Sequence, residues 1–405
     1  MFPDTSDPQY DQGWNGDLDG WRDKGGKVIE YRTVKAREVW NAIIESAWAS
    51  AEPGLWFGER SNKESNSAYF NPLICTNPCV TGDMRISTDR GLIRARELFD
   101  SETNPNVVID GRFGYAQTTT PASRVIRTGV KPVFRVQTQE GYYVRATADH
   151  RIMTEDGWVE VQNLQPGDRI HIVNRKGGFG AQGSLELGRV LGSEFVANEI
   201  VLEVEFAEAV GGRAVARPYI ADSVARRDAQ RRVRSEVPEG VFQGSEDMQR
   251  GFLQALFTAD GGFQDGGAKG GSIRLAANSA ELLEQVQMLL LNFGIASRIY
   301  RNRRDAGYRQ MPDANREMKA YWCEAQHELV ISKRSMNVFA DEIGFLMTYK
   351  QDKLEAYLSR GSRGTYSESF TARVESVVAD GVEEVFDLTE PLTHSFVANN
   401  IVLHN

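Results

Sequence analysis

The sequence has 405 residues, of which 41% are hydrophobic and 25% are charged, and its formal net charge is −9 at pH 7. A chain of this length can form two to four cores, and its composition is that of a globular protein rather than a disordered one. No run approaches the roughly 18 consecutive apolar residues of a membrane span, and the N-terminus lacks the basic-then-apolar order of a secretory signal. We therefore expect neither membrane partners nor export. The three cysteines favour a reduced, cytoplasmic setting.

Residues 1–78 are predicted to form a short flank with one helix and long loops. Residues 1–30 are rich in Asp and Gly and show no sustained hydrophobic period. From Val34 to about Ser50, apolar residues recur at steps of three and four, which predicts a helix with one buried face. The run Glu52-Pro53-Gly54 then ends this helix.

The rest of the chain is predicted to be a β domain with an insertion. Short alternating runs, separated by Gly, Pro and Asp, predict strands over residues 79–174. Several glycines then indicate a hinge, and residues 175–367 show mixed helical and strand patterns. The alternating pattern resumes in residues 368–405. We therefore expect residues 79–174 and 368–405 to form one domain that is split by residues 175–367.

Chemically reactive side chains lie near the two ends of this split domain. The candidates are Cys79, Thr147, His150, Asp387, His394, His404 and Asn405. Taken singly, a cysteine is more often a small buried hydrophobe than a nucleophile, and a lone histidine is usually structural. The joint arrangement favours chemistry, because three of the five histidines fall in these segments.

In their order along the chain, these segments resemble the motifs of an intein. CVTGDMRISTDRGLIRARELF resembles the N-terminal splicing block, GYYVRATADHRIMTEDGWVEVQNLQPGD the Thr-x-x-His block, and RVESVVADGVEEVFDLTEPLTHSFVANNIVLHN the two C-terminal blocks. The resemblance covers residues 79–405 and implies a mainly β, horseshoe-like Hedgehog/intein splicing domain. A Hedgehog-type autoprocessing domain is disfavoured, because such domains lack the terminal His-Asn pair.

The resemblance gives each residue of the N-terminal reaction a role. Cys79 would attack the carbonyl of Pro78, the scissile junction, and convert the amide to a thioester. Thr147 would hold the strained bond, and His150 would protonate the departing nitrogen, a task that suits imidazole. Asp387 would promote deprotonation of Cys79 from a partly dry pocket that raises the pKa of its own carboxyl group.

At the other end, the resemblance implies that Asn405 cyclises to a succinimide while His404 and His394 polarise its carbonyl and move the proton. The whole process is autocatalytic, single-turnover and free of external cofactors. The family usually reads FVANG where this chain has FVANN, and Asn400 is expected to keep the left-handed turn of that glycine. The sequence shows no nucleophile after Asn405, so we expect cleavage at the Pro78 junction without ligation.

The first 78 residues resemble the host region of a class II, adenosylcobalamin-dependent ribonucleotide reductase. The resemblance rests on EPGLWFGERSN and on TNP immediately before Cys79. It implies that Cys79 belongs to the intein and that the flanking segments, the exteins, are its partners in cis. Adenosylcobalamin would serve only the intact host reductase, and this fragment is expected to have no reductase activity.

Within the insertion, FLQALFTADGGF (Phe252 to Phe263) resembles the helix of a LAGLIDADG homing endonuclease, which implies an inserted α/β endonuclease-like domain. Its closing acid, Asp260, would bind a divalent metal, Mg²⁺, that activates water. The upstream candidate helix has Val-Ala-Asn where Gly-Asp-Gly is expected, with Glu194 and Glu199 as substitute acids. The missing motif acid makes double-strand cutting doubtful.

Arginine-rich stretches within the insertion are candidates for contact with double-stranded DNA. The candidates are Arg226, Arg227, Arg231, Arg232, Arg301 and Arg303. Runs of arginine can neutralise the phosphates of DNA. A helix face that is simply exposed to solvent can be equally rich in arginine, so both interpretations stay open. The alternatives to splicing are thus a site-specific homing endonuclease and a catalytically dead DNA-binding remnant, and in each case we expect a monomer.

Overall fold

The computed structural model describes residues 2–4, 6–8, 10, 18–30, 33–50, 79–196, 236–267, 270–312, 318–360 and 368–405. The chain forms two compact units, Met1–Thr76 and Asn77–Asn405, which are described separately here. In the described part of the chain, no helix combines the length and apolar character that crossing a membrane requires.

The first unit contains one long amphipathic helix with an exposed apolar face. Its elements are β1 (Phe2–Pro3), α2 (Leu18–Asp23), β2 (Val28–Ile29), which pairs antiparallel with β1, and α3 (Ala36–Ser50). Helix α3 confirms the helix predicted from Val34 to about Ser50. The expectation that its apolar face is buried is wrong, because Val39, Trp40 and Ile44 are 44%, 45% and 51% exposed. An apolar stripe of this kind needs a further surface to bury it.

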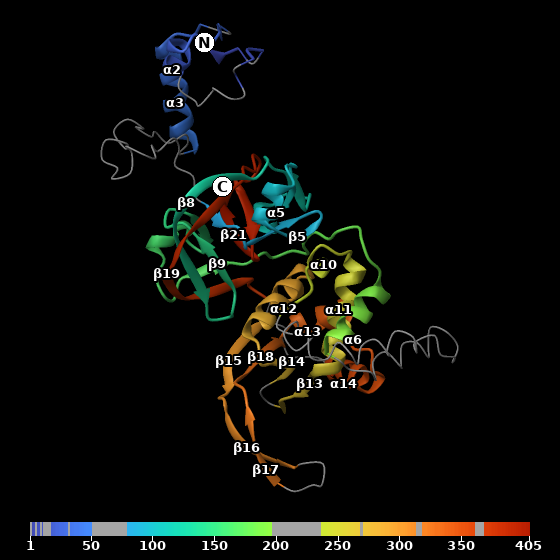
Figure 1. Cartoon of the computed structure of the whole chain (residues 1–405). Helices are drawn as coiled ribbons and strands as arrows, with labels where there is room; N and C mark the ends of the chain where they lie inside the picture. Colours follow the sequence, from blue (N-terminus) through green and yellow to red (C-terminus); the bar gives the residue numbers. More distant parts are fainter. Residues whose placement is uncertain are drawn as a thin grey trace. The chain divides into compact units, whose positions relative to one another are not determined.

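The second unit is built on an antiparallel sheet system that joins its two ends (Figure 1). In the described residues the strand order is β3-β9-β8-β19-β12-β10-β21-β20-β4-β6-β7, with β5 beside β4 and β11 beside β10. The bounds are β3 (Val80–Thr81), β4 (Arg85–Thr88), β5 (Gly91–Arg94), β6 (Asn106–Val108), β7 (Thr119–Pro121), β8 (Ile126–Thr138), β9 (Tyr143–Ala146), β10 (Arg151–Thr154), β11 (Gly157–Glu160), β12 (Arg169–His171), β19 (Thr371–Asp387), β20 (Ser395–Ala398) and β21 (Ile401–His404). Short helices α5 (Ala95–Asp100), η1 (Gly111–Phe113) and η2 (Val161–Asn163) connect them.

Strands from both sides of the insertion pair with each other. The long strand β19 runs antiparallel to β8, and it also pairs with β12. Strand β21 pairs with β10 through Ile152 and Leu403. Ile152, Phe386 and Phe396 are fully buried in the shared core. These pairings confirm a mainly β domain whose two segments close on each other across an insertion.

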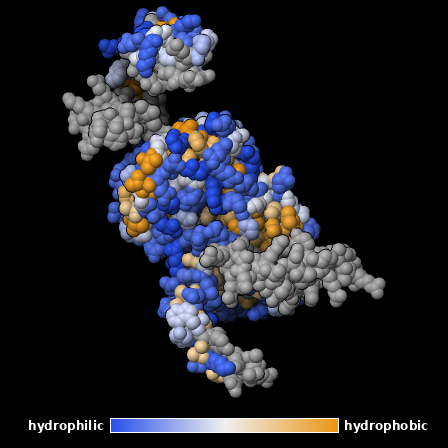
Figure 2. Space-filling model, viewed as in Figure 1, coloured by the Kyte–Doolittle hydropathy of each residue, from blue (hydrophilic) through white to orange (hydrophobic). Residues whose placement is uncertain are grey.

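The insertion forms an α/β layer with its own core. Its four-stranded sheet has the order β13-β14-β18-β15, and the separate ribbon β16–β17 extends away from it in Figure 1. The bounds are α6 (Leu185–Val196), α10 (Glu239–Phe242), α11 (Glu246–Asp260), β13 (Gly261–Asp265), β14 (Gly271–Ala277), α12 (Ala280–Asn292), β15 (Arg298–Arg304), β16 (Gly307–Pro312), β17 (Met318–Cys323), β18 (Gln326–Ser332), α13 (Ser335–Glu342) and α14 (Thr348–Leu358). Figure 2 shows a mainly hydrophilic surface over the second unit, with separate hydrophobic patches.

Helices α6 and α11 approach each other closely because glycines face the neighbouring backbone. A Cβ atom on Gly188 would lie 2.1 Å from the carbonyl oxygen of Met248, and one on Gly251 would lie 2.2 Å from that of Leu185. Real side chains do not tolerate such distances, so glycine is required for this contact.

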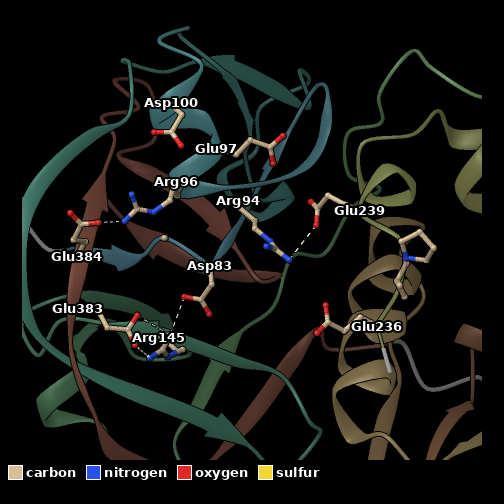
Figure 3. A pocket seen from close by; sticks show the side chains of 13 residues that line it. Asp83, Arg94, Arg96, Glu97, Asp100, Arg145, Glu236, Glu239, Glu383 and Glu384 are labelled. Atoms are coloured by element: carbon tan, nitrogen blue, oxygen red, sulfur yellow. Dashed lines mark hydrogen bonds and ion pairs between the residues drawn. The ribbon is translucent and has the colours of Figure 1, made fainter. Parts of the chain in front are cut away.

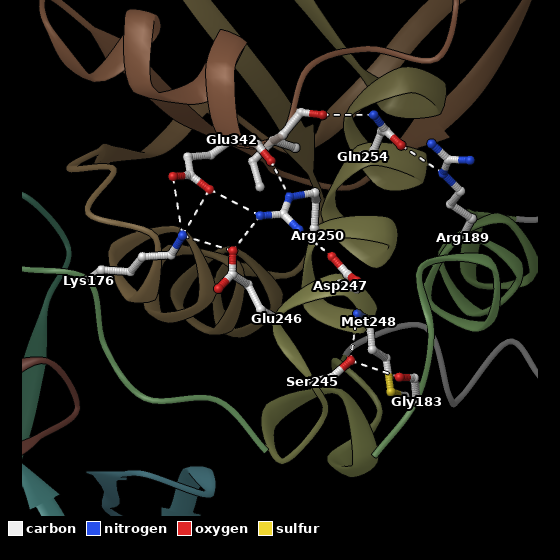
Figure 4. Close-up of polar contacts among 11 residues, drawn as sticks. Lys176, Gly183, Arg189, Ser245, Glu246, Asp247, Met248, Arg250, Gln254 and Glu342 are labelled. Atoms are coloured by element: carbon white, nitrogen blue, oxygen red, sulfur yellow. Dashed lines mark hydrogen bonds and ion pairs between the residues drawn. The ribbon is translucent and has the colours of Figure 1, made fainter. Parts of the chain in front are cut away.

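A polar network ties the segment after β12 to the inserted domain (Figure 4). The Nζ atom of Lys176 donates to Oε1 of Glu246 at 2.8 Å and to Oε2 of Glu342 at 3.1 Å. Arg250, on α11, contacts the same two carboxylates. One lysine and one arginine thereby link the connecting segment to α11 and α13.

A second polar contact joins the β domain directly to the insertion. The side chain of Arg85, on β4, is only 5% exposed, and its two terminal nitrogens donate to the carboxylate of Glu239 at 2.6 and 2.7 Å. Its guanidinium carbon also lies 3.6 Å from the centre of the Phe242 ring. A buried cation of this kind depends on its carboxylate partner.

Replacing Glu239 by alanine is expected to lower the free energy of unfolding by about 2 kcal/mol, because the buried Arg85 guanidinium loses its charged acceptor. Urea denaturation of the purified chain measures this change. Glu236→Ala is the matched control, since this exposed acid precedes the same helix and its loss should cost less than about 0.5 kcal/mol. Equal stability of the two variants would show that the Arg85 contact contributes little.

Candidate active site

Cys79 immediately precedes β3, is fully buried, and is held by the backbone and the side chain of Thr147 in the Thr-x-x-His turn. Its amide donates to Oγ1 of Thr147 at 3.0 Å, and its carbonyl oxygen accepts from the amide of Thr147 at 2.9 Å. The pairing of Val80 with Ala146 brings β3 beside β9, so the turn after β9 falls next to Cys79. The structure therefore brings Cys79 and Thr147 together, as the sequence predicted.

The sulfur of Cys79 has a mixed apolar and polar environment. Val133 and Val385 pack around it, Oγ1 of Thr128 lies 2.7 Å from Sγ, and Nζ of Lys131 donates to Sγ at 3.4 Å. Burial raises the pKa of the Cys79 thiol to about 11, while Thr128 and Lys131 pull it down.

His150 is a fully buried histidine whose ring nitrogens have no hydrogen-bond partner among the described residues. Its ring packs edge-on against Phe396 with a centroid distance of 6.0 Å. Burial lowers the pKa of His150 to about 4, although the charge of Asp149 and the backbone of Cys79 oppose this shift. The ring is therefore neutral at pH 7, and its burial opposes a lasting positive charge on it.

Asp387 is the last residue of β19 and is 4% exposed. Its negative charge raises the pKa of Cys79 and so acts against the thiolate. The predicted proximity of Asp387 to Cys79 is present, but the charge of an ionised Asp387 does not itself stabilise the sulfur anion.

The two C-terminal histidines lie around Asn405. The amide of Asn405 donates to the carbonyl oxygen of His394 at 3.1 Å, and Nδ1 of His404 lies 2.5 Å from the backbone oxygen of Asn405. The two imidazole rings are nearly parallel, with centroids 6.4 Å apart, and Trp158 packs edge-on against the His404 ring at 4.9 Å. The structure thus gathers all three predicted C-terminal residues in one place.

A buried carboxylate that no motif pointed to organises the loop before β20. Glu390 is fully buried, and its carboxylate accepts hydrogen bonds from the amides of Leu392 and Thr393 at 2.6 and 2.7 Å. Its backbone oxygen accepts from Nδ2 of Asn405 at 3.2 Å. Glu390 therefore holds both the loop that carries His394 and the amide group of Asn405.

The turn between β20 and β21 has the left-handed backbone that the sequence predicted. Asn400 has φ 68°, and Asn399, which precedes it, also has a positive φ of 44°. Two consecutive left-handed residues are the geometry of a two-residue hairpin loop that suits the strand twist. The side chain of Asn399 accepts from the amide of Arg85 at 2.8 Å, which anchors this turn to β4.

The N-terminal and C-terminal groups form one site. Strand β10, which follows His150, pairs with β21, which ends at His404. A charge on His404 lowers the pKa of His150, which reflects their proximity. Some predicted site residues lie outside the described part of the chain: Pro78, Arg226, Arg227, Arg231 and Arg232.

The predicted endonuclease residues do not form a metal site in the described part of the chain. Asp260 ends α11, and the ammonium group of Lys350 donates to the carbonyl oxygens of Thr258 and Gly261 at 2.6 and 2.7 Å. Among the described residues, no three His, Cys, Asp or Glu side chains gather where they could hold an ion. Asp260 therefore belongs to no such cluster among the described residues, and metal binding by Asp260 stays a prediction.

The two described DNA candidates on β15 are already paired with acidic groups. Arg301 contacts Glu284, and Nε of Arg303 lies 3.4 Å from Oε2 of Glu328. Such pairs reduce the positive charge that is available to phosphates.

A large cavity of about 1220 Å³ lies between the β domain and the segment before α10, away from the reactive groups (Figure 3). The ion pair of Arg94 with Glu239 crosses it, that of Arg96 with Glu384 lies along its β-domain wall, and acidic side chains outnumber arginines along its walls. Neither Cys79 nor Asn405 lines it, so this cavity is a charged interface between modules and is separate from the candidate active site.

Comparison with known proteins identifies two parts of the chain. Residues 247–344 match the family model of a LAGLIDADG-like domain, and residues 21–81 match the ribonucleotide reductase barrel domain. The chain is 27% identical to the ribonucleoside-diphosphate reductase NrdEB subunit alpha of Bacillus subtilis (strain 168), over 90% of this chain and 39% of that protein. It is 45% identical over 56 residues to the vitamin B12-dependent ribonucleotide reductase of Agrobacterium fabrum, which covers 14% of this chain and 4% of that protein.

A third relative is a helicase rather than a reductase. The replicative DNA helicase DnaB of Rhodothermus marinus is 27% identical, over 81% of this chain and 46% of that protein. The chain spans less than half the length of each of these curated relatives. Among solved structures, a DnaB intein from Synechocystis sp. PCC 6803 is 14% identical, covers 81% of this chain and 98% of its own, and has a TM-score of 0.30. The fold assignment follows from the strand pairing and not from that score.

The chain therefore combines an intein-like, mainly β domain with a LAGLIDADG-like domain inserted into it. Its N-terminal flank, residues 21–81, is similar to the barrel domain of ribonucleotide reductases. These findings confirm the resemblance that the sequence motifs indicated, while the roles of the individual residues stay predictions.

Proposed function

We propose that this chain is an intein precursor that cleaves its own backbone at Pro78-Cys79 and after Asn405. One observation carries the proposal: Thr147 links buried Cys79 to the turn that carries buried His150, and the pairing of β10 with β21 puts His404, which contacts Asn405, on the strand next to that turn. Burial excludes water, so the acyl group reacts with the neighbouring side chain in preference to hydrolysis.

The first step is an acyl shift from nitrogen to sulfur. The Cys79 sulfur attacks the carbonyl carbon of Pro78, the new C–S bond forms, and the C–N bond to Cys79 breaks. As these bonds form and break, the thiol proton passes by way of the His150 ring to the departing nitrogen, which becomes a free amino group. Thr147 holds that nitrogen through the 3.0 Å hydrogen bond before the bond breaks.

The second step releases whatever follows Asn405. Its Nδ2 attacks its own backbone carbonyl carbon, the ring closes to a succinimide, and the bond to the following nitrogen breaks. Nδ2 loses one proton, and the leaving amine gains one. His404 polarises the carbonyl through the 2.5 Å contact of Nδ1, and the backbone oxygen of Glu390 orients Nδ2. If a Cys, Ser or Thr follows Asn405, it would take the acyl group and join the flanks.

The pattern of relatives supports an element that moves between host genes. Residues 79–405 make up about four fifths of the chain, and the helicase match covers a similar share. The activities of a reductase and a helicase are unrelated, so a segment that both proteins contain is not expected to serve either activity. The flank that matches the reductase barrel then marks the host in which this copy is inserted.

Incubation of the purified chain with a thiol is expected to release residues 1–78, because the thiol captures the thioester at Cys79. Intact mass spectrometry before and after treatment measures this release. Cys79→Ala should release none, whereas Cys323→Ser, which changes a cysteine on the distant strand β17, should behave as the parent chain does. Persistence of the full-length mass in the parent chain would contradict the proposal.

The LAGLIDADG-like match supports a second candidate function, binding of double-stranded DNA by the inserted domain. The described residues provide no metal site, so no cleavage step is derived for it. DNA binding whose affinity falls steeply as salt is added would support this function. If the chain does not bind DNA even at low salt, the inserted domain has no DNA-binding role.

A further inference from the structure

The Cys79 sulfur is held by two side chains of β8 to which no sequence motif pointed. Oγ1 of Thr128 lies 2.7 Å from Sγ, and Nζ of Lys131 donates to Sγ at 3.4 Å. A positive charge and a hydroxyl proton both favour a thiolate over a thiol. We propose that Lys131 and Thr128 stabilise the negative charge that develops on the Cys79 sulfur as the thiol gives up its proton and attacks the preceding carbonyl, an inference that rests on the function proposed above.

A β-bulge explains why Thr128 reaches the sulfur. Val385 on β19 pairs with Gly129, but the next residue, Phe386, pairs with Arg127, so Thr128 is the extra residue of β8. Gly129 has φ 127°, a conformation that favours glycine. Bulges redirect a side chain and are frequent beside active sites. The irregularity thus turns the Thr128 hydroxyl toward Cys79.

The Thr128 hydroxyl can serve the sulfur in both protonation states. Oγ1 also lies 3.3 Å from the carbonyl oxygen of Val385, to which it can donate its proton. When Cys79 is a thiol, S–H donates to Oγ1 while the hydroxyl donates to Val385. When the thiol proton leaves, the hydroxyl rotates and donates to the thiolate instead. No heavy atom has to move, so the site is organised for the anion in advance.

Several groups shift the pKa of the Cys79 thiol, and Lys131 is a cation among them. Burial raises the pKa of Cys79 to about 11, Asp387 adds to that rise, and Thr128 and Lys131 oppose it. His150 lies beside the Cys79 backbone and is neutral at pH 7. The positive charge of Lys131 is the cationic contribution that lowers the pKa of the Cys79 thiol.

The thiolate fraction of Cys79 tests the proposal without any splicing step. We expect Lys131→Met to reduce this fraction several-fold at one alkaline pH, because losing the cation should raise the thiol pKa by about one unit. The measurement is ultraviolet thiolate absorbance relative to a matched Cys79→Ala chain, in a background with Cys75→Ser and Cys323→Ser. Circular dichroism at the same pH verifies folding. Lys131→Arg should keep most of the thiolate signal.

The same variants should change thiol-induced release of residues 1–78. At neutral pH we expect Lys131→Met to slow release about tenfold, matching one unit of pKa. Thr128→Val should also slow it, while Thr128→Ser should retain most of the rate. Arg127→Met is the matched control, because this exposed β8 cation contacts Glu384 and not the sulfur.

The two proposals fail in different ways. A folded Lys131→Met chain with the parent thiolate fraction would overturn the role of Lys131, even if release were slower. If the parent chain releases nothing under thiol, the splicing function fails, whereas the absorbance measurement still decides whether Lys131 stabilises the sulfur anion.

Discussion

Replacing His150 by alanine is expected to slow thiol-induced release of residues 1–78 by about 10²–10⁴-fold, the usual contribution of a general acid–base group. The departing amide nitrogen is a poor leaving group unless it is protonated as the bond breaks. His150 lies in the turn that binds Cys79 through Thr147, and burial keeps its ring neutral at pH 7. Time courses of intact mass at fixed pH measure the effect.

A packing defect must be separated from lost proton transfer in this variant, because the His150 ring packs against Phe396. His150→Asn keeps a polar side chain of intermediate size and should be nearly as slow as His150→Ala. His327→Ala is the control, since this histidine lies on β18 of the inserted domain. Release at the parent rate from a folded His150→Asn chain would remove His150 from the mechanism.

Replacing Asn405 by alanine is expected to abolish cleavage after residue 405 in a fusion that carries a reporter protein there. The alanine side chain has no amide nitrogen to close the succinimide ring, so no residual route through this step remains. His404→Ala should retain the nucleophile but lose the contact of Nδ1 with the Asn405 carbonyl, and should slow release by about 10²-fold or more. Gel densitometry of the freed reporter follows both variants.

The N-terminal reaction provides an internal control for these two variants. Asn405→Ala should still release residues 1–78 under thiol, because Cys79 and its partners are unchanged. Asn163→Ala, at an exposed position of η2, should leave reporter release intact. Reporter release from Asn405→Ala at the parent rate would exclude cyclisation of this asparagine.

Much of the β domain could be predicted from local patterns. Alternating residues indicated strands on both sides of the insertion, and the pattern after the linker resumes at Thr371, where β19 begins. The left-handed turn at Asn400 was predictable because its residue type and place between two strands restrict the backbone. The grouping of Cys79 with Thr147 followed from motif order, although only the pairing of β3 with β9 shows how they meet.

The supporting residues were not predictable, because their contacts depend on tertiary structure. Thr128 and Lys131 lie in an ordinary strand pattern. Gly129 was the only local sign of the bulge that turns the Thr128 side chain toward Cys79. Glu390 lies in a Pro-containing turn, where an acid is normally solvated, yet it is fully buried. Strand register and loop closure, rather than composition, put these side chains beside the reacting groups.

The exposed stripe of α3 has a consequence for the order in which a precursor matures. Val39, Trp40 and Ile44 face solvent, whereas the second unit has well-packed cores of its own. The second unit can therefore fold on its own core, whereas α3 is stabilised further only when another surface covers its apolar face. On the function proposed above, excision would then precede burial of this face, and slow excision would prolong the time during which an exposed apolar surface favours aggregation.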